Sequence, residues 1–486
     1  MSDQILKLDP EKVWKNFYSL TQIPRPSGKE KEVADFVKKF GEKLGLYTYV
    51  DQVGNVIIRK PATKGMENRK GIILQGHLDM VPQKNSDTPH DFEKDPIDAV
   101  VCNDWVCANG TTLGADNGIG VAAILSVLES TDIIHGQVEA LLTVDEETGM
   151  TGAFGLQSGS LTGDILLNLD SEDEGELYIG CAGGINANLK LSFKEELTGD
   201  NYSSFKLSIT GLKGGHSGLD INLGRGNSNK LMFRFLKNIL NVLEARLVSI
   251  DGGSLRNAIP REAFAVVVVP RQNASKFKDY VKQYEQIFKN ELVKTEPDLK
   301  LEATPCELPG KMMDARSQNT LVNAIYACPN GVIRMSDGIP GLVETSNNLA
   351  IVRSNACETE VVCLLRSSVD SAKDDLAMAV SSVFELAGAK IELSGGYPGW
   401  KPNPDSEILT LMKDIYNSKY GNIPEVKAIH AGLECGLLGG VYPKWDMISF
   451  GPTIRYPHSP DEKVHIISVR KFWDYLVETL KNVPLK

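Results

Sequence analysis

The chain of 486 residues has little that would suit it to nucleic acid or to a membrane. Its 52 Lys and Arg residues are outnumbered by 63 Asp and Glu residues, and they form no dense basic run that would neutralise a series of phosphates. It also lacks an apolar stretch long enough to span a bilayer, and Met1 to Pro10 has no basic start followed by an apolar segment. We therefore expect a cytoplasmic protein that binds neither nucleic acid nor membranes.

Cysteine pairs with metal-binding spacing are also missing, and histidine is scarce. The eight cysteines are scattered without a CxxC pair, so we expect reduced thiols. The seven histidines are His77, His90, His135, His216, His430, His458 and His465. Of these, His90 and His135 lie in polar loops and His465 lies in an apolar strand, which favours structural or solvent-facing roles for these three.

The composition is that of a folded protein, and the length of the chain indicates more than one hydrophobic core. Hydrophobic residues make up 42% and charged residues 24%, which is ordinary globular usage. A chain of this length exceeds what one core usually organises. We expect an α/β catalytic domain with a mixed sheet flanked by helices, formed by residues 1–186 and 396–486. An α+β domain of residues 187–395 is expected as an insertion.

The expected strands of the catalytic domain end just before polar residues. In α/β sheets, ligand sites gather at the carboxyl ends of the strands. Strands are expected over 55–59, 71–74, 138–144, 164–169, 205–209, 264–269 and 360–365, and helices over 30–44, 121–128, 229–243, 372–386 and 407–416.

His77 and Asp79 follow the strand 71–74 in the segment Gln75-Gly-His-Leu-Asp79. Residues two apart on an extended backbone project to the same side, so Asp79 can orient the imidazole as carboxylates do for metal-bound histidines. Taken alone, this motif is more simply a His and an Asp that end a strand. Asp116, in Gly114-Ala-Asp-Asn-Gly118, likewise presents a carboxylate at a helix start, where capping is the commoner role.

Three consecutive carboxylates, Asp145, Glu146 and Glu147, end another apolar strand. Their mutual repulsion needs a compensating positive charge, although a solvated strand end would also tolerate it. A bound dication would make Glu147 a ligand and leave Glu146 free to take a proton. Asp170 closes a further apolar strand, and the carboxylates that follow it at 172–174 are expected in a solvated loop.

His458 lies in a rigid, proline-rich loop, Tyr456-Pro-His-Ser-Pro460, far along the chain from the other candidates. Two dications would balance Asp116, Glu147, Asp170 and a bridging hydroxide, with both histidines neutral. Histidine and carboxylate ligands suit zinc, manganese or cobalt.

Taken together, these motifs resemble the co-catalytic zinc peptidases that include carnosinase, aminoacylase and carboxypeptidase relatives, over essentially the whole chain. The length, Gly214-Gly-His-Ser-Gly218 and His430-Ala-Gly-Leu-Glu-Cys-Gly436 are most similar to bacterial cytosolic aminoacyl-histidine dipeptidases. The resemblance implies two zinc ions per subunit, with cobalt or manganese as substitutes. It implies that Asp116 bridges both metals, that His77 and Asp170 complete one site and Glu147 and His458 the other, that Glu146 is the general base, and that Asp79 supports His77.

The resemblance also implies that the inserted domain is a lid that mediates homodimerisation. It implies that His216 stabilises the oxyanion, that Arg366 holds a substrate carboxylate, and that Asn257 and Gly432 contact substrate. From the residues alone, His216 is as readily a loop histidine, and Arg366 more readily a surface salt-bridge partner. His430 and Glu434 are either recognition groups or structural.

We therefore predict a dipeptidase that hydrolyses short unblocked dipeptides, including Xaa-His and β-alanyl-histidine. Water activated by two zinc ions would be the nucleophile and Glu146 the base. The alternatives are an N-acyl amino acid deacylase on the same metal site or a broader di/tripeptidase. A non-catalytic zinc-binding scaffold and a two-metal phosphoesterase are less favoured, because the base is present and no phosphate-binding glycine loop lies beside the motifs.

Overall fold

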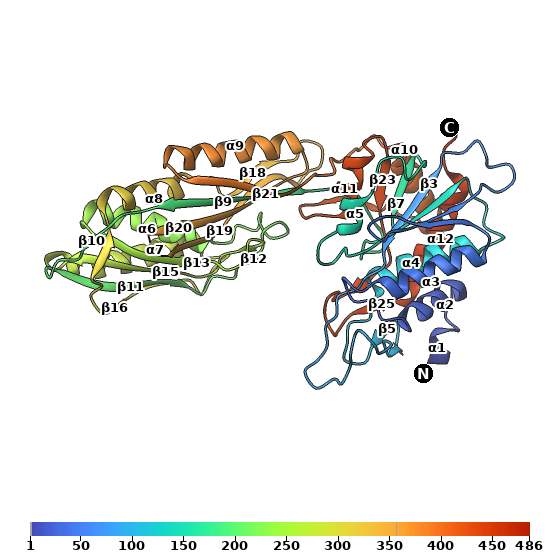
Figure 1. The fold of residues 1–486 in the computed structure, drawn as a ribbon, viewed down its shortest axis with the longest axis horizontal. Helices are drawn as coiled ribbons and strands as arrows, with labels where there is room; N and C mark the ends of the chain where they lie inside the picture. Colours follow the sequence, from blue (N-terminus) through green and yellow to red (C-terminus); the bar gives the residue numbers. More distant parts are fainter. Residues whose placement is uncertain (1, 356) are drawn as a thin grey trace. The chain divides into compact units, whose positions relative to one another are not determined.

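The computed structural model describes residues 2–355 and 357–486, and the chain folds into two compact units (Figure 1). The first unit comprises the chain up to Cys181 together with Trp400–Ala428 and Leu433–Lys486. The second comprises Ala182–Gly399 and Ile429–Gly432. The sequence pattern places the divisions at 186/187 and 395/396, and it contains no signal for the short second segment of the second unit.

The first unit is built on an eight-stranded mixed sheet of order β1-β2-β6-β3-β7-β23-β8-β22. Strand β3 runs parallel to both neighbours, β6 and β7, and β23 runs parallel to β7. Every residue of β3, β6 and β7 is buried, as expected for central parallel strands covered on both faces. The strands are β1 (Tyr47–Val50), β2 (Val56–Lys60), β3 (Ile72–His77), β6 (Val138–Thr143), β7 (Ile165–Asn168), β8 (Glu176–Cys181), β22 (Glu425–Ile429) and β23 (Asp446–Ser449).

Helices flank this sheet. The same unit also contains a separate four-stranded sheet of order β24-β25-β5-β4. Helix α4 is apolar on all sides and is buried along almost its whole length, where it packs against β3 and α2. Helix α10 begins where the Ser406 hydroxyl accepts the backbone N–H of Leu409 at 3.0 Å. The helices are α1 (Ser2–Ile5), α2 (Glu11–Thr21), α3 (Lys31–Lys43), α4 (Ala115–Glu129), α5 (Thr151–Gly155), α10 (Glu407–Tyr420), α11 (Glu434–Val441) and α12 (Ile466–Asn482), and the short strands are β4 (Ala99–Cys102), β5 (Trp105–Ala108), β24 (Ile454–Arg455) and β25 (Lys463–His465).

The second unit is a nine-stranded antiparallel sheet packed against helices α6 to α9. Its main path runs β16-β11-β15-β13-β19-β20-β9-β21, with β18 paired to β19. The strands of this sheet are β9 (Gly183–Ser192), β11 (Tyr202–Thr210), β13 (Arg246–Gly252), β15 (Ala263–Pro270), β16 (Lys300–Pro305), β18 (Gly331–Met335), β19 (Val343–Asn355), β20 (Glu358–Ser367) and β21 (Lys390–Tyr397). Two short strand pairs are β10 (Glu195–Leu197) with β17 (Lys311–Met313) and β12 (Gly215–His216) with β14 (Ala258–Ile259). The helices are α6 (Ser228–Val242), η1 (Arg271–Asn273), α7 (Ala274–Glu291), α8 (Ala315–Ala327) and α9 (Asp370–Leu386).

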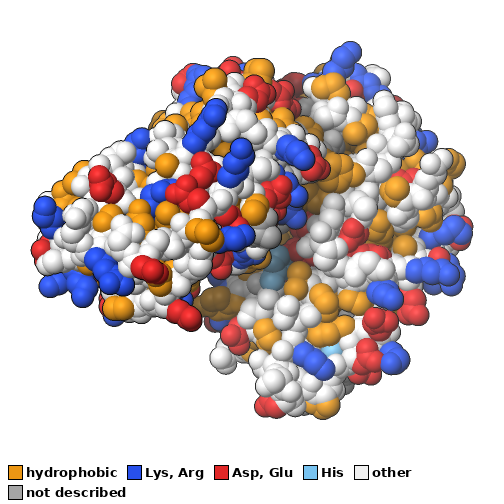
Figure 2. All heavy atoms as spheres, turned by 60° about the vertical axis from the view of Figure 1, so that its left-hand side comes forward, with side chains coloured by type: hydrophobic (Ala, Val, Ile, Leu, Met, Phe, Trp, Pro, Cys, Tyr) orange, Lys and Arg blue, Asp and Glu red, His pale blue; other side chains and the backbone are white. Residues whose placement is uncertain are grey.

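The surface carries charges of both signs. On the face drawn in Figure 2, Lys and Arg side chains lie among Asp and Glu side chains rather than in one continuous basic area. Among the helices that the structure describes, none has the length and apolar character needed to cross a membrane.

Candidate functional site

The candidate site lies where the parallel strands of the first unit end. His77 is the last residue of β3, Asp170 lies two residues beyond the end of β7, and Glu147 lies four residues beyond the end of β6. Because parallel strands end at the same edge of a sheet, these three segments meet there. Asp116 joins them from the first turn of α4, where its backbone angles (φ −81°, ψ 111°) are not yet helical.

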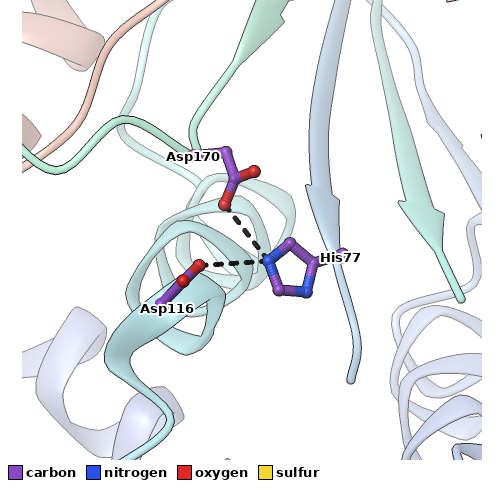
Figure 3. A group of neighbouring side chains, drawn as sticks. All are labelled: His77, Asp116 and Asp170. Atoms are coloured by element: carbon purple, nitrogen blue, oxygen red, sulfur yellow. Dashed lines mark hydrogen bonds and ion pairs between the residues drawn. The ribbon is translucent and has the colours of Figure 1, made fainter. Parts of the chain in front are cut away.

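One group of side chains forms around His77. Its Nε2 lies 3.1 Å from Asp116 Oδ1 and 3.2 Å from Asp170 Oδ1. Figure 3 shows both carboxylates directed at the same ring nitrogen, Asp116 from α4 and Asp170 from the loop after β7. A nitrogen and two carboxylate oxygens facing one point are the donors that zinc and similar dications prefer.

A second group forms around His458, in the loop between β24 and β25. Its Nε2 lies 2.9 Å from Glu147 Oε2 and 3.3 Å from Asp116 Oδ2. Asp116 therefore presents one oxygen to each histidine and joins the two groups. The ligand atoms of each group lie within 4.8 Å of one another.

The residues present fit bound metal. Glu147 Oε1 is buried, and among residues 2–355 and 357–486 it has no hydrogen-bond partner. Such an orphaned carboxylate oxygen is costly unless a cation accepts its lone pairs. Nitrogen and oxygen donors without a thiolate match zinc, manganese or cobalt better than softer metals. The five residues therefore form a candidate metal site.

Asp79 links the end of β3 to the segment after β6, and both carry candidate metal ligands. Its carboxylate lies 3.3 Å from His77 Nδ1 and accepts the backbone N–H of Glu146 at 3.0 Å and of Glu147 at 3.2 Å. The hydroxyl of Ser27 donates to it at 2.8 Å. Burial would raise its pKa, but these donors hold that pKa below the ordinary value. Asp79 thus stays ionised and leaves the opposite nitrogen of His77 for a ligand.

Burial raises the pKa of several carboxylic acids at the site, and Glu146 is one of them. Burial, helped by Asp170, Glu434 and Glu147, raises the pKa of Glu146 well above its ordinary value. A carboxylate with a raised pKa is suited to accepting a proton. Burial likewise raises the pKa of Asp170 to about 7, although His77 opposes the shift.

Two buried charged residues that the sequence analysis leaves without a role hold the loop before α4. Glu462 is 2% exposed, and its carboxylate accepts four successive backbone N–H groups, those of Leu113, Gly114, Ala115 and Asp116, at 2.6–3.2 Å. Arg25 donates to the carbonyls of Leu78, Asp79 and Gly114. The sequence feature that could have pointed to Glu462 is its position four residues after His458. Its hydrogen-bond partners lie about 350 residues away in the sequence, so the sequence pattern could not reveal them.

The carboxylates after Asp170 differ from the expectation of a solvated loop. Residues 172–174 are half-buried, and burial raises the pKa of Glu172 to about 8. Asp173 pairs with Arg455 at 2.8 Å, and Glu174 pairs with Lys471 at 3.3 Å. That expectation was wrong because the basic partners come from the far end of the chain.

The sequence-predicted residues of the second unit lie near one another within that unit. Arg366, at the end of β20, is 5% exposed and donates to Ser217 Oγ at 3.3 Å and Tyr397 OH at 3.1 Å. Neither partner is negatively charged. The alternative of a surface salt-bridge arginine is therefore wrong, because Arg366 is buried and its side-chain partners among residues 2–355 and 357–486 are uncharged.

His216 lies beside Arg366's partner Ser217. Its Nδ1 accepts the backbone N–H of Gly218 at 3.2 Å and of Leu219 at 3.0 Å. The proton of the neutral ring therefore resides on Nε2, which makes that atom a donor. Burial, then the charge of Arg366, lowers the pKa of His216 and favours this neutral form.

Asn257 and Gly432 border the same part of the second unit. The Asn257 carbonyl accepts the N–H of Ser217 at 2.8 Å, and the Asn257 side chain is exposed. A Cβ on Gly432 would lie 3.2 Å from the ring of Tyr397, so a larger residue would crowd Arg366's partner.

His430 and Glu434, both left open by the sequence, belong to different units. His430 is 6% exposed in the second unit, and its Nε2 lies 2.7 Å from Ser346 Oγ. Glu434 is 1% exposed at the start of α11 in the first unit, where Gln75 and Thr143 donate to it.

The fold and site are those of a metal-dependent hydrolase, and comparison with known proteins identifies the class. Residues 73–482 match the peptidase family M20/M25/M40. The chain is 48% identical over 483 residues to the cytosol non-specific dipeptidase of Escherichia coli (strain K12), covering 99% of this chain and 100% of that protein. The chain therefore belongs to peptidase family M20/M25/M40, and it is a peptide-bond hydrolase.

Solved structures agree with this assignment. An aminoacylhistidine dipeptidase from Vibrio alginolyticus superposes with a TM-score of 0.96 at 49% identity over 100% of both chains. The aminopeptidase PepT from Bacillus cereus ATCC 10987 shares the fold at a TM-score of 0.58 and 16% identity over 98% and 99% of the two chains. The predicted fold class is confirmed, and the full-length relatives are dipeptidases, which does not favour the deacylase alternative.

Proposed function

We propose that this protein is a two-zinc dipeptidase that acts on short unblocked dipeptides, Xaa-His and β-alanyl-histidine among them. The observation that carries the proposal is the Asp116 carboxylate, which presents one oxygen to each of two His-carboxylate groups, at 3.1 Å and 3.3 Å. The names of the two full-length relatives support a dipeptide substrate and a preference that includes histidine.

Five residues would hold the metals. His77 and Asp170 would complete one site, Glu147 and His458 the other, and Asp116 would bridge them. Zinc, or cobalt or manganese in its place, would polarise the peptide carbonyl and lower the pKa of a bound water.

The protein's own groups would move the protons. Glu146 takes a proton from the attacking water and passes it to the leaving amine, a role that suits its raised pKa. Asp79 keeps His77 in one tautomer and, through the N–H groups of Glu146 and Glu147, fixes the segment that carries the base.

Residues of the second unit would bind the substrate. Arg366 pairs with the substrate's terminal carboxylate, which favours short peptides. His216 donates from Nε2 to the developing oxyanion, a type of contact worth ~2.7–4 kcal/mol. Asn257 and Gly432 contact the substrate through the amide and the backbone.

The test is a panel of dipeptides, tripeptides and N-acetyl amino acids assayed before chelation, after chelation, and after zinc, manganese or cobalt is restored. We expect the dipeptides to be cleaved fastest, activity to disappear on chelation, and two metal ions per chain on elemental analysis. Glu146→Gln should retain both metals and lose at least ~1000-fold in kcat. Near-normal turnover by that variant with both metals bound would contradict the mechanism.

A further inference from the structure

Glu434 is a buried carboxylate of the first unit to which the mechanism above gives no role. Its Oε2 accepts the Gln75 amide at 2.6 Å and the Thr143 hydroxyl at 2.8 Å. Its Oε1 is also buried, yet no donor reaches it from the part of the chain that the structure describes. A buried carboxylate oxygen without a donor is destabilising, so this atom needs a partner that comes from elsewhere.

The two partners of Oε2 place Glu434 beside the reacting centre. Gln75 lies two residues before His77 on β3, so the two side chains share one face of the strand. Thr143 lies directly opposite His77 in the parallel register of β3 and β6. Burial raises the pKa of Glu434 to about 7, an increase that His77 opposes and Asp170 supports, and the charge of Glu434 contributes to the raised pKa of Glu146. Glu434 therefore stands within electrostatic reach of the base.

A chain of buried polar side chains holds this carboxylate in place. Gln75 Oε1 accepts the Asn168 amide at 2.5 Å, and Asn168 Oδ1 in turn accepts the hydroxyl of Ser449. Gln75, Asn168 and Ser449 come from three neighbouring strands, β3, β7 and β23. Oε2 is thus fixed by the central sheet, and the direction of Oε1 is fixed with it.

The other buried carboxylates of the site already have partners. Both oxygens of Glu462 are occupied by backbone N–H groups, two on each. Asp79 is occupied by His77, Ser27 and two backbone N–H groups. Asp116, Glu147 and Asp170 face the candidate metal positions. Glu434 Oε1 is thus a buried carboxylate oxygen that neither a donor from the described part of the chain nor a candidate metal position accounts for.

We propose that Glu434 binds the free N-terminal amino group of the dipeptide and so selects unblocked substrates. This inference rests on the proposed function. An unblocked dipeptide carries an ammonium group, whose N–H donates to Oε1 in a charge-assisted hydrogen bond. A substrate without that amine leaves the buried oxygen unpaired, and a site built around such a contact rejects the analogue strongly.

The test compares alanyl-histidine with propionyl-histidine, which differs from it by the absence of the amine. We expect the wild-type enzyme to prefer alanyl-histidine by at least ~100-fold in kcat/KM. Glu434→Gln should reduce that preference to less than ~10-fold, chiefly by slowing alanyl-histidine. Glu434→Asp, which keeps the charge, should retain most of the preference and serves if the first variant folds poorly. Calorimetry with both compounds in the Glu146→Gln background measures the same preference as binding.

Glu462→Gln is the matched control, because it changes another buried carboxylate whose oxygens are both occupied. It should slow both compounds by the same factor and leave the preference unchanged. Equal loss on both compounds in Glu434→Gln would overturn the inference and leave Glu434 as a positioning residue for Gln75 and Thr143. Failure of the metal-loaded wild-type enzyme to cleave any dipeptide would instead overturn the proposed function, and this inference with it.

Discussion

Single residues at this site take their properties from burial more than from their own chemistry. His77 and His430 are both nearly inaccessible to solvent, at 1% and 6% exposure. Burial opposes the charge on each ring, but three carboxylates raise the pKa of His77, whereas Arg366 reinforces the lowering at His430. The same residue type is thus a candidate metal ligand among carboxylates in one unit and a neutral hydrogen-bonding group in the other.

His430 leads to a prediction about acid stability. Burial, then Arg366, lowers its pKa to about 3, below the ordinary value of 6.5. Between these values the unfolded chain binds the proton and the native chain does not, so stability is complete above about pH 6.5 and falls as the pH falls. Unfolding followed by denaturant from pH 7.5 to 5 should show wild type losing ~2 kcal/mol more than His430→Gln.

The control for that measurement is His465→Gln, in the first unit, where the ring packs on Trp105. It should follow the wild-type profile. Parallel profiles for wild type and His430→Gln would show that His430 is protonated in the native protein and would contradict the assignment.

At the scale of elements, polar ends of strands decide where the site lies. The sequence predicts a strand over 71–74, where the apolar run stops, but β3 continues through Gln75 and Gly76 to His77. These residues remain in the ladder because they are buried against β6 and β7, where side-chain partners satisfy them. The helix expected over 121–128 likewise begins earlier, at Ala115, because Glu462 holds its first turn.

The loop before α4 gives a prediction at this scale. In Glu462→Gln, the amide group would face two of the four backbone N–H groups that the carboxylate now accepts, and donors would oppose donors. We expect a loss of about 2–3 kcal/mol in the free energy of unfolding and weaker zinc binding, because Asp116 follows this loop directly. Denaturant titration and zinc competition assays measure the two effects.

Glu11→Gln serves as the comparison, since Glu11 forms an exposed ion pair with Lys15 at 2.5 Å. It should leave the free energy of unfolding almost unchanged, because solvent screens an exposed ion pair. Similar losses in the two variants would mean that the four N–H contacts of Glu462 do not hold the metal-binding loop.

At the scale of the whole molecule, we propose a cytoplasmic homodimer formed through the second unit. The resemblance to dimeric zinc peptidases and the word cytosol in the Escherichia coli relative's name support this proposal. The second unit also exposes apolar side chains on α9, with Leu386 at 92% and Met378 at 63% exposure. Contiguous apolar patches, rather than single exposed side chains, mark surfaces that associate, so the part of α9 in a dimer has to be tested directly.

Light scattering of the zinc-loaded protein after gel filtration checks this proposal. We expect a mass of twice 53.1 kDa at micromolar concentration, independent of substrate. A fully active protein that elutes with the mass of one chain would rule out an obligate dimer, and the same measurement on Leu386→Glu would report whether α9 takes part.

The sequence alone determined the candidate chemistry and the fold class. The residues at the ends of apolar strands can be read from the local sequence. The spacing in His77-x-Asp79 and the run Asp145–Glu147 therefore indicate the candidate metal-binding and catalytic groups directly. Tertiary structure decided which groups support that chemistry. Glu462, Arg25 and the orphaned oxygen of Glu434 depend on contacts across tens to hundreds of residues, and burial, which sets each pKa, exists only once the sheets have assembled.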